Sequence, residues 1–599
     1  MMNRPAGTGQ YFKNNLFFII CLTLAVIFSR EAFAQEAETE FILDPNSSTV
    51  VLPAIFRPNI DLSGRGFNRQ GDWPQGLASK EVIDIWQKDL GFSGIYRLQY
   101  NLWEISQLAK DKQLQEGLLS NYESIIKNIS DSGGIVILNL FSTPAGLGKV
   151  LDKRSPPWDE KAFKELIKSY IRHLSCEKKY NIWYEVWNSP DLGEFFLGKK
   201  PEYFLLYRIV AESAKELEAE TKIRIPVGGP SVSWWFQNLN GNTIFNPEGS
   251  LIYELIKFCY RNRLPLDFIS WHGYSTDPKA EKEATLYKKT AVTLIREWLV
   301  YFRFNSNIPL VIDEWNYDCC VNLLQERGNK AYIAASYIPA RLKGMRQEGV
   351  SHQVYFSLED FQNNPEGVIR NVGAFWLDDS QPQYKGGSKC IYNTFRMLAK
   401  LGDKLFVTQA KPEDDFLGVF ATKGKDYIAI LAYNYVDPYI ARNYLSKNIA
   451  GLNSSEIKSI LTLIQSYDLN KILNRQMDIE SLRVSKREKT LLTEARKLND
   501  LYLKLSSTPR NLKIEVKNLK NTYIYERYVI DASCALDCAF LPVENKEVVP
   551  VDLYQEKLVV NPYSVQLIVL KEKPKEPEPA VVIIEQSPAN NTIAGNVTN

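Results

Sequence analysis

A group of polar side chains follows several short apolar segments of the sequence, at or near the point where each segment ends. These residues are Arg97, Asn188, Ser189, His272, Tyr274 and Glu314, with Trp187 and Trp315 beside them. Carboxylate, amide and imidazole groups can bind the hydroxyl groups of a polar ligand, and aromatic faces can pack against the C–H surface of a sugar ring. If the fold brings these segments together, the set is suited to recognition of a sugar.

The apolar segments alternate with longer amphipathic segments from about residue 50 to residue 401, which is typical of repeated βα units. The expected strands are residues 55–60, 94–99, 134–140, 182–187, 223–228, 266–271, 310–314 and 353–357. The expected helices are residues 79–90, 114–130, 159–176, 201–220, 249–262, 283–304 and 331–347.

Eight strands with helices between them predict an α/β fold of the (β/α)8 TIM-barrel type over residues 50–401. A doubly wound open sheet is the alternative, but no glycine-rich phosphate loop follows the first strand. In a barrel the C-terminal ends of all strands form one rim, so the polar residues named above would meet there.

The pattern of hydrophobic and polar residues changes after residue 402. Alternating segments at residues 416–421, 427–433, 512–516, 523–530 and 564–570 predict a β-sandwich over residues 402–570. A charged helical insertion is expected at about residues 454–502, and its role cannot be read from the sequence. Residues 571–599 are rich in proline and charge and predict a flexible tail.

Residues 1–34 are typical of a signal peptide. Arg4 and Lys13 precede an apolar run at residues 16–28, and Ala32-Phe33-Ala34 resembles a cleavage site. The sequence therefore predicts an exported protein, in a periplasm, at the cell surface or secreted. An uncleaved N-terminal anchor is the alternative. No later segment reaches the roughly 18 uninterrupted apolar residues of a membrane-spanning helix.

Composition excludes several classes of function. Lys+Arg 72 against Asp+Glu 70 gives a net charge of +2, so there is no basic field for nucleic acid. The three histidines are far apart and no CxxC or HExxH motif occurs, so neither a metal nor an organic cofactor is expected. Among the cysteines that follow residue 34, the spacing of Cys534 and Cys538 suggests a local disulfide.

Several motifs, in order along the chain, resemble glycoside hydrolase family 39 of clan A. EVWNSPDL at residues 185–192 is similar to the EVWNEPNL of that family, DFISWHGYS at 267–275 to its sixth strand, and LVIDEWN at 310–316 to its nucleophile strand. VGGPS at 227–231, the helix at 388–402, and ILAYNY and ERYVID in the sandwich add to the resemblance, which covers roughly residues 55–440 and 510–570. The family holds retaining β-xylosidases and α-L-iduronidases.

The resemblance implies a role for each matching residue. A retaining mechanism uses two carboxylates about 5–5.5 Å apart, one as nucleophile and one as acid/base. Glu314 matches the nucleophile, and Asn188 matches the residue that holds the hydroxyl next to the anomeric carbon. His272 and Tyr274 match residues near the nucleophile, and Arg97 would keep it ionised. The remaining candidates for substrate binding are Trp187 and Trp315.

The chain departs from the family at the acid/base position, where Ser189 stands in place of glutamate. A hydroxyl cannot protonate a departing sugar oxygen near neutral pH, and general acid–base catalysis commonly contributes about 10²–10⁴ in rate. Three hypotheses follow. The first is a hydrolase with a displaced acid, for which Asp191 is the first candidate and Glu194 and Glu359 are others. The second is a pseudoenzyme that binds a polysaccharide, and the third is an enzyme for activated leaving groups.

Two neighbouring carboxylates are assigned structural parts. Glu185 is interpreted as a structural partner, with Arg97 as the candidate residue that it pairs with. Asp313 is expected to point away from Glu314, because successive side chains of a strand alternate. The expected partner of the protein is a poly- or oligosaccharide. The sugar, the linkage and the oligomeric state are not readable from the sequence.

Overall fold

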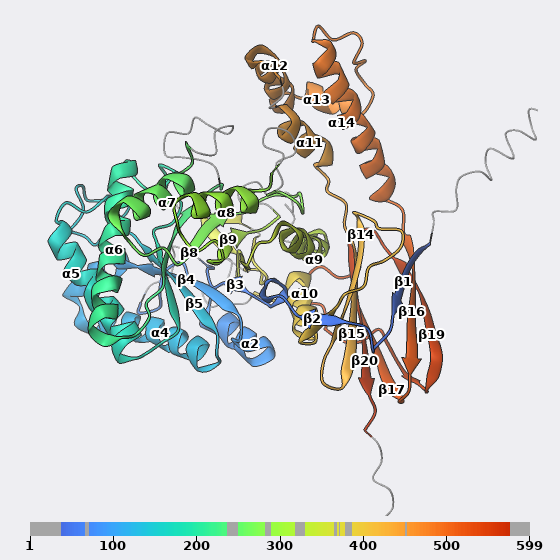
Figure 1. Cartoon of the computed structure of the whole chain (residues 1–599), viewed down its shortest axis with the longest axis horizontal. Coiled ribbons are helices and arrows are strands. Elements are labelled where there is room, and N and C mark those ends of the chain that lie inside the picture. The colour runs from blue at the N-terminus through green and yellow to red at the C-terminus, as the bar shows by residue number, and fades with distance from the viewer. Residues whose placement is uncertain are drawn as a thin grey trace, which may run out of the picture.

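A barrel and a sheet-rich C-terminal domain make up the protein (Figure 1). The computed structural model describes residues 38–65, 71–235, 249–281, 289–317, 330–363, 368–370, 372–377, 386–449 and 452–574. The predicted signal peptide and the tail beyond residue 574 lie outside the described residues. No helix among the described residues is long and apolar enough to cross a membrane.

Eight parallel strands close into a barrel in the order β10, β3, β4, β5, β6, β7, β8 and β9. Their bounds are β3 Ile60–Asp61, β4 Ile95–Asn101, β5 Ile135–Phe141, β6 Ile182–Val186, β7 Val227–Val232, β8 Phe268–His272, β9 Leu310–Trp315 and β10 His352–Tyr355. Nearly every strand residue is buried, because helices cover the outside and side chains fill the inside. The predicted (β/α)8 barrel is confirmed.

Helices follow the strands around the outside of the barrel (Figure 1). Their bounds are α2 Lys80–Leu90, α3 Leu102–Gln107, α4 Lys112–Asp131, α5 Glu160–Ile171, α6 Lys200–Thr221, α7 Leu251–Asn262, α8 Ala291–Tyr301, α9 Ala331–Glu348 and α10 Cys390–Ala399. Side chains at the N-caps, such as Asp111, Asp159, Ser250 and Thr290, accept backbone hydrogen bonds and so define where the helices begin.

Two predicted strands are misplaced, and proline explains both differences. Residues 55–60 were expected to form the first strand, but a short 3-10 helix, Ala54–Phe56, follows Pro53, and β3 begins only at Ile60. The strand expected at 223–228 begins after Pro226, as β7. A proline has no N–H for the strand ladder, so it favours a start or an interruption of a strand.

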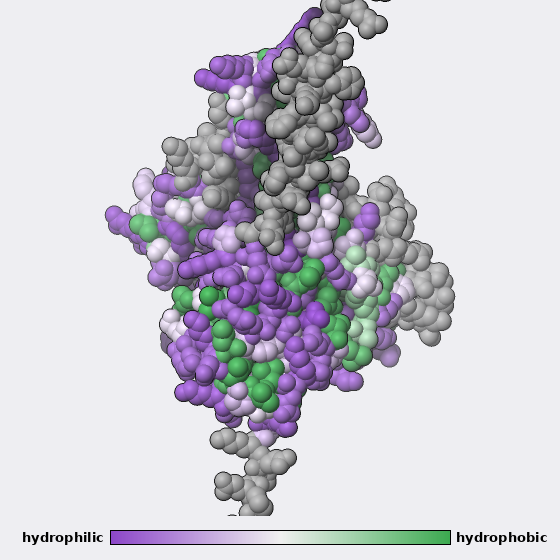
Figure 2. Space-filling view, turned by 90° about the vertical axis from the view of Figure 1, so that its right-hand side faces the viewer, coloured by the Kyte–Doolittle hydropathy of each residue, from purple (hydrophilic) through white to green (hydrophobic). Residues whose placement is uncertain are grey.

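The C-terminal domain holds two sheets, in agreement with the predicted β-sandwich. One sheet has the order β18-β17-β20-β15-β14-β13-β2 and the other the order β1-β16-β19. The strands are β1 Thr39–Leu43, β2 Thr49–Val51, β13 Lys404–Phe406, β14 Leu417–Lys423, β15 Tyr427–Asn434, β16 Arg510–Leu519, β17 Tyr523–Ile530, β18 Glu544–Val548, β19 Val551–Val560 and β20 Ser564–Glu572. Figure 2 shows this side of the molecule as largely hydrophilic, with separate hydrophobic clusters.

Sequence reasoning missed strands β1, β2, β18 and β19. Strand β1 pairs in parallel with β16, with Phe41 opposite Ile514, and β2 pairs with β13. The first described strands, β1 and β2, therefore belong to the C-terminal domain, and the barrel strands follow them in the sequence. These pairings join segments hundreds of residues apart, and short or polar edge strands carry little local signal.

The helical insertion stands beside the barrel rim (Figure 1). It consists of α11 Ile440–Asn448, α12 Ser454–Gln465, α13 Asp468–Leu473 and α14 Lys486–Leu505, and it has a small apolar core of its own. Lys447 on α11 pairs with Asp277 and donates to the carbonyl of Lys279, in the loop that follows β8. The insertion thus braces one of the loops at the rim.

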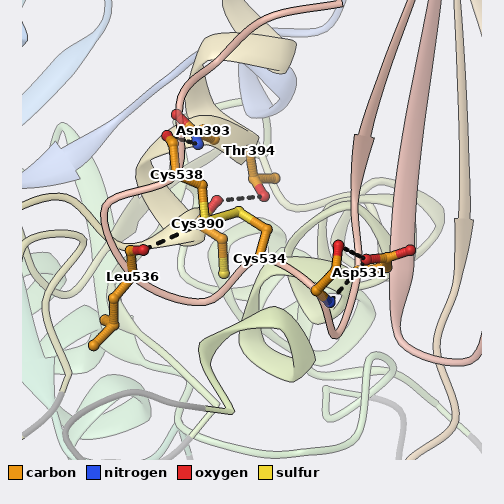
Figure 3. Close-up of a disulfide and its surroundings, with 8 residues drawn as sticks. Cys390, Asn393, Thr394, Asp531, Cys534, Leu536 and Cys538 are labelled. Atoms are coloured by element: carbon orange, nitrogen blue, oxygen red, sulfur yellow. Dashed lines mark hydrogen bonds between the residues drawn. A yellow bond between two sulfur atoms is a disulfide. The ribbon is translucent and has the colours of Figure 1, made fainter. Parts of the chain in front are cut away.

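A disulfide joins Cys534 to Cys538, as the spacing suggested, in the loop between β17 and β18 (Figure 3). The loop docks on the start of α10. The Cys390 N–H donates to the carbonyl of Ala535 at 2.9 Å, and the Asn393 amide donates to the carbonyl of Cys538 at 3.0 Å. The bridge therefore holds a contact between the C-terminal domain and the helix that leaves the barrel.

A buried ion pair between α9 and the loop after β8 gives a test of the fold. Arg341 donates to both carboxylate oxygens of Glu281 at 2.5 Å, and both side chains are fully buried. We expect Glu281→Gln to lower the free energy of unfolding by about 3–5 kcal/mol, because it leaves a buried guanidinium without its counter-charge. Urea denaturation followed by circular dichroism measures the change.

The control is the exposed pair of Lys80 and Asp84, whose side chains are 63% and 55% exposed. Asp84→Asn should change the free energy of unfolding by less than about 0.5 kcal/mol, because solvent screens an exposed pair. Equal effects of the two substitutions would contradict the assigned importance of the buried pair.

Candidate active site

The guanidinium of Arg97 lies at the centre of the barrel interior, fully buried, among four carboxylates. Its NH1 donates to Glu314 Oε1 at 2.6 Å and to Asp61 Oδ2 at 3.0 Å, and its Nε donates to Glu185 Oε2 at 2.7 Å. Asp313 Oδ2 lies 3.9 Å from the same Nε. The expected contact between Glu185 and Arg97 is confirmed.

One positive charge cannot balance four negative ones in a buried site, so some of these carboxyl groups must hold protons. Burial, and then the charge of Glu185, raises the pKa of Asp313 well above its usual range. Burial raises the pKa of Asp61 to about 6. For Glu185 burial acts in the same direction, but Arg97 and hydrogen bonds outweigh it, and its pKa lies below the usual value.

Burial and the negative charge of Glu185 therefore favour the protonated form of Asp313. Neither of its oxygens has a hydrogen-bond partner among the described residues. This buried position offers no route for it to reach a ligand.

Glu314 differs from the other three carboxylates because a ligand can reach it. Its side chain is 7% exposed, whereas those of Asp61, Glu185 and Asp313 are fully buried. Its Oε2 accepts a hydrogen bond from the Tyr274 hydroxyl at 2.9 Å. Burial raises the pKa of Glu314, while Arg97 and Tyr274 act to lower it, so the net shift is upward. Glu314 is thus the one member of the cluster placed to act on a bound molecule.

Strands β8 and β9 place His272 next to Glu314. The two residues are partners in the register of the parallel pair, after a bulge between Trp271 and His272. The Gly273 N–H donates to the carbonyl of Glu314 at 2.7 Å. A Cβ at residue 273 would lie 2.7 Å from Ile312 Cγ2, so glycine is needed for this close approach.

Asn188 and Ser189 come from the chain that leaves β6. Asn188 Oδ1 accepts a hydrogen bond from Arg97 NH2 at 2.6 Å, and within the described part of the chain its amide nitrogen has no acceptor. Ser189 has a φ of 43°, in the left-handed region, and its N–H donates to the carbonyl of Ser231 at 2.9 Å. Trp187 is also left-handed, with a φ of 67°. This unusual backbone turns Ser189 toward the site.

A single nitrogen of His272 lies between Ser189 and Glu314. His272 Nδ1 is 3.4 Å from Ser189 Oγ and 3.6 Å from Glu314 Oε2. Position 189 therefore faces the same small space as the candidate nucleophile. Burial, and then the charge of Arg97, lowers the pKa of His272 to about 3, so the imidazole is neutral at physiological pH.

The candidate substitute acids are engaged elsewhere. The two oxygens of Asp191 accept hydrogen bonds from the N–H and the hydroxyl of Ser233, which follows β7, and burial raises the pKa of Asp191. Glu359 accepts from the N–H and hydroxyl of Ser79, at the start of α2. Glu194 is exposed to solvent.

Both tryptophans proposed for substrate binding are buried in the walls of the barrel. Trp187 donates from its indole nitrogen to the carbonyl of Phe195 at 3.1 Å, and its ring packs against Phe141 and Phe196. Trp315 donates to Gln353 Oε1 at 2.6 Å and is fully buried. Both rings are buried against other aromatic side chains, so neither is exposed to a ligand.

Three polar residues of the site were missed in the sequence. Asp61 ends β3 one residue beyond the predicted strand, Ser231 lies within the VGGPS motif, and Asn139 lies within a predicted strand. Asn139 Nδ2 donates to Glu185 Oε2 at 2.9 Å. Each could have been noticed as a polar residue within or at the end of an apolar strand, which is costly to bury without a partner.

Known proteins resemble this chain in sequence over part of its length. The family model for glycosyl hydrolases family 39 matches residues 148–457. A β-xylosidase of Caldicellulosiruptor saccharolyticus is 30% identical over 265 residues, 41% of this chain and 49% of the relative. A β-xylosidase of Geobacillus stearothermophilus is 29% identical over 204 residues, 30% of this chain and 36% of the relative. The chain thus matches half or less of the length of these curated relatives.

Solved structures share the fold at low sequence identity. A glucosidase from Croceicoccus marinus has a TM-score of 0.58 at 15% identity, with 90% of this chain and 100% of that chain covered. A monomeric β-xylosidase from Caulobacter crescentus CB15 has a TM-score of 0.57 at 18% identity, with 89% and 99% covered. The matched family model spans more than half of the 599 residues, and the chain therefore belongs to glycosyl hydrolases family 39.

Proposed function

We propose that this protein is an exported retaining O-glycoside hydrolase of a poly- or oligosaccharide, with Glu314 as the nucleophile. The observation that carries the proposal is the selective exposure of Glu314 within the Arg97 cluster. Arg97 and Tyr274 each hold one of its oxygens, which orients the carboxylate. Export rests on the signal-like residues 1–34 of the sequence.

The geometry supports the first half of a retaining mechanism. Glu314 attacks the anomeric carbon and forms a covalent glycosyl–enzyme intermediate. The amide nitrogen of Asn188, which has no acceptor among the described residues, can donate to the hydroxyl next to that carbon. Arg97 offsets the charge of Glu314 before the attack, because it is buried, always protonated and hydrogen-bonded to it.

This chain differs from the retaining mechanism at the second carboxylate, the acid/base. Ser189 occupies the space across His272 from Glu314 and carries no acidic proton at neutral pH. Asp191 could replace it only by giving up its hydrogen bonds to Ser233. Loss of the acid is therefore favoured over its displacement.

A second candidate function is polysaccharide binding without cleavage. The observation that favours it is again Ser189, since a site without its acid cleaves unactivated sugar linkages slowly. Both candidates predict carbohydrate in the barrel mouth, and turnover separates them. The names of the relatives make xyloside and glucoside the first substrates to test.

Covalent labelling tests the assigned nucleophile. Dinitrophenyl glycosides that carry fluorine beside the anomeric carbon need no acid to lose their leaving group, and the fluorine slows release of the intermediate. With the matching sugar, we expect the intact mass to rise by one glycosyl unit and the labelled peptide to contain Glu314. Mass spectrometry of the intact and digested protein provides the measurement.

Two variants control the labelling. Glu314→Gln should abolish it, because the amide is a far weaker nucleophile. Glu177→Gln removes a carboxylate on the outer surface, 58% exposed, and should leave labelling unchanged. A label on another carboxylate would refute the assignment, and absence of any label with tight binding to a glycan would favour the binding function.

The pH profile gives a further prediction. Glu314 acts as a carboxylate, and its pKa is raised, so activity on a dinitrophenyl glycoside should fall as pH drops through a value above the usual 4.5. In a glycosidase with a general acid, activity normally also falls as pH rises, because the acid loses its proton. On a phenyl glycoside, whose leaving group needs a proton, this alkaline loss should be missing with Ser189, and Ser189→Glu should introduce it. Rates from pH 4 to about pH 9 measure both limbs.

A bell-shaped profile for the wild-type protein would mean that another group supplies the proton. Asp191→Asn then identifies or excludes the first candidate, because it removes the titrating carboxyl while retaining an acceptor for Ser233.

A further inference from the structure

We propose that position 189 is an oxyanion donor, so that the natural glycosyl donor carries an anionic leaving group, a phosphate or a carboxylate, at its anomeric carbon. This inference rests on the proposed role of Glu314 as nucleophile. It changes one part of the proposed function: the bond that is cleaved joins the anomeric carbon of the saccharide to a phosphate or a carboxylate, and does not join one sugar to another.

The argument starts at Arg97, whose guanidinium can only donate hydrogen bonds. Its NH2 lies 3.2 Å from Ser231 Oγ, so this oxygen accepts from Arg97 and must use its own proton on another partner. His272 Nε2 lies 3.2 Å from Ser231 Oγ, while the other acceptor, Asn188 Oδ1, is 3.4 Å away and already receives Arg97 NH2. The Ser231 hydroxyl is therefore assigned as a donor to His272 Nε2.

This assignment sets the tautomer of His272. A neutral imidazole that accepts at Nε2 carries its proton on Nδ1. The Nδ1–H faces Ser189 Oγ at 3.4 Å and the carboxylate of Glu314 at 3.6 Å, both of which accept. His272 thus presents a donor, not a lone pair, to Ser189.

The hydroxyl proton of Ser189 is left over for a ligand. Its oxygen accepts from His272, and it makes no other side-chain hydrogen bond within the described residues. The N–H of Ser189 donates to the carbonyl of Ser231, and its Oγ accepts from His272. The backbone and the hydroxyl oxygen are therefore both held before a ligand binds. The chain from Arg97 through Ser231 and His272 therefore ends in a fixed, polarised donor beside the anomeric carbon.

Such a donor suits a departing oxyanion better than a departing alkoxide. It stabilises negative charge but does not transfer its proton, because a serine hydroxyl is far too weak an acid. A glutamate at residue 189 would repel an anionic group, whereas a hydroxyl accepts one. The site therefore favours leaving groups that depart as stable anions.

The reaction balances without a general acid. A Glu314 oxygen forms a bond to the anomeric carbon, the bond from that carbon to the phosphate or carboxylate oxygen breaks, and its electron pair leaves with the anion. Water then attacks the glycosyl–enzyme intermediate, which frees Glu314 and the sugar and releases a proton to solvent. A second oxyanion can attack in place of water and regenerate a glycosyl phosphate or ester.

The test uses the sugar whose fluorinated glycoside labels Glu314. Its glycosyl phosphate, its anomeric acetyl ester and its methyl glycoside are compared as substrates by release of phosphate, acetate or methanol. We expect the wild-type protein to use the phosphate, the ester or both at least about 10²-fold faster than the methyl glycoside, with kcat/KM as the readout. The relative rates of phosphate and ester identify which oxyanion the site takes.

Two substitutions at residue 189 distinguish the effect of the hydroxyl group from an effect on folding. Ser189→Gly removes the donor and suits the φ of 43°, so it should slow the oxyanion donors by about 10²-fold while Glu314 is still labelled. Ser189→Glu should lose the oxyanion donors and gain the methyl glycoside. Ser213→Ala removes a buried hydroxyl on α6, bonded to the carbonyl of Ile209, and should change neither rate.

Two outcomes would overturn the inference. One is a wild-type protein that uses the methyl glycoside as fast as the phosphate and the ester. The other is a Ser189→Gly variant with unchanged rates on the oxyanion donors. In either case labelling of Glu314 would preserve the proposed nucleophile, whereas a protein that no fluorinated glycoside labels would refute the proposed function itself.

Discussion

The burial of Arg97 is the constraint on which the barrel interior depends. A guanidinium cannot lose its proton, so its charge must be balanced inside the fold. Asp61, Glu185 and Glu314 bind it directly. Because these carboxylates exceed the charge they balance, some of them must hold protons, and burial favours the protonated form of Asp313 by raising its pKa. The only member that solvent reaches is Glu314, and this selects it for chemistry.

The rest of the structure holds this cluster in place. Arg97 comes from β4, Asp61 from β3, Glu185 from β6 and Glu314 from β9, so closure of the barrel is what brings the charges together. The loop after β8 is braced twice, by Arg341 on α9 and by Lys447 on the helical insertion. The C-terminal domain in turn contacts α9 and α10. Domains remote in sequence therefore stabilise the rim beside Glu314.

The serine at residue 189 changes what this frame can do. The nucleophile side retains its arginine, tyrosine and asparagine, while the opposite side offers a neutral imidazole and a hydroxyl. Under the proposed mechanism such a site forms a covalent intermediate, and Ser189 supplies no acidic proton for a departing sugar alkoxide. The reaction then depends on the leaving group of the substrate, because a leaving group that departs as a stable anion needs no proton from the protein.

The sequence by itself determined the (β/α)8 barrel, because alternating apolar segments are a local signal, and the resemblance of its motifs pointed to Glu314 as the candidate nucleophile. It also indicated the disulfide of Cys534 and Cys538, whose spacing is local. It could not show that β1 and β2 belong to the C-terminal domain, or that Ser231 links Arg97 to His272. Those facts depend on contacts between distant segments, and only the closed barrel, with its buried charges and shared protons, decides which side chains meet.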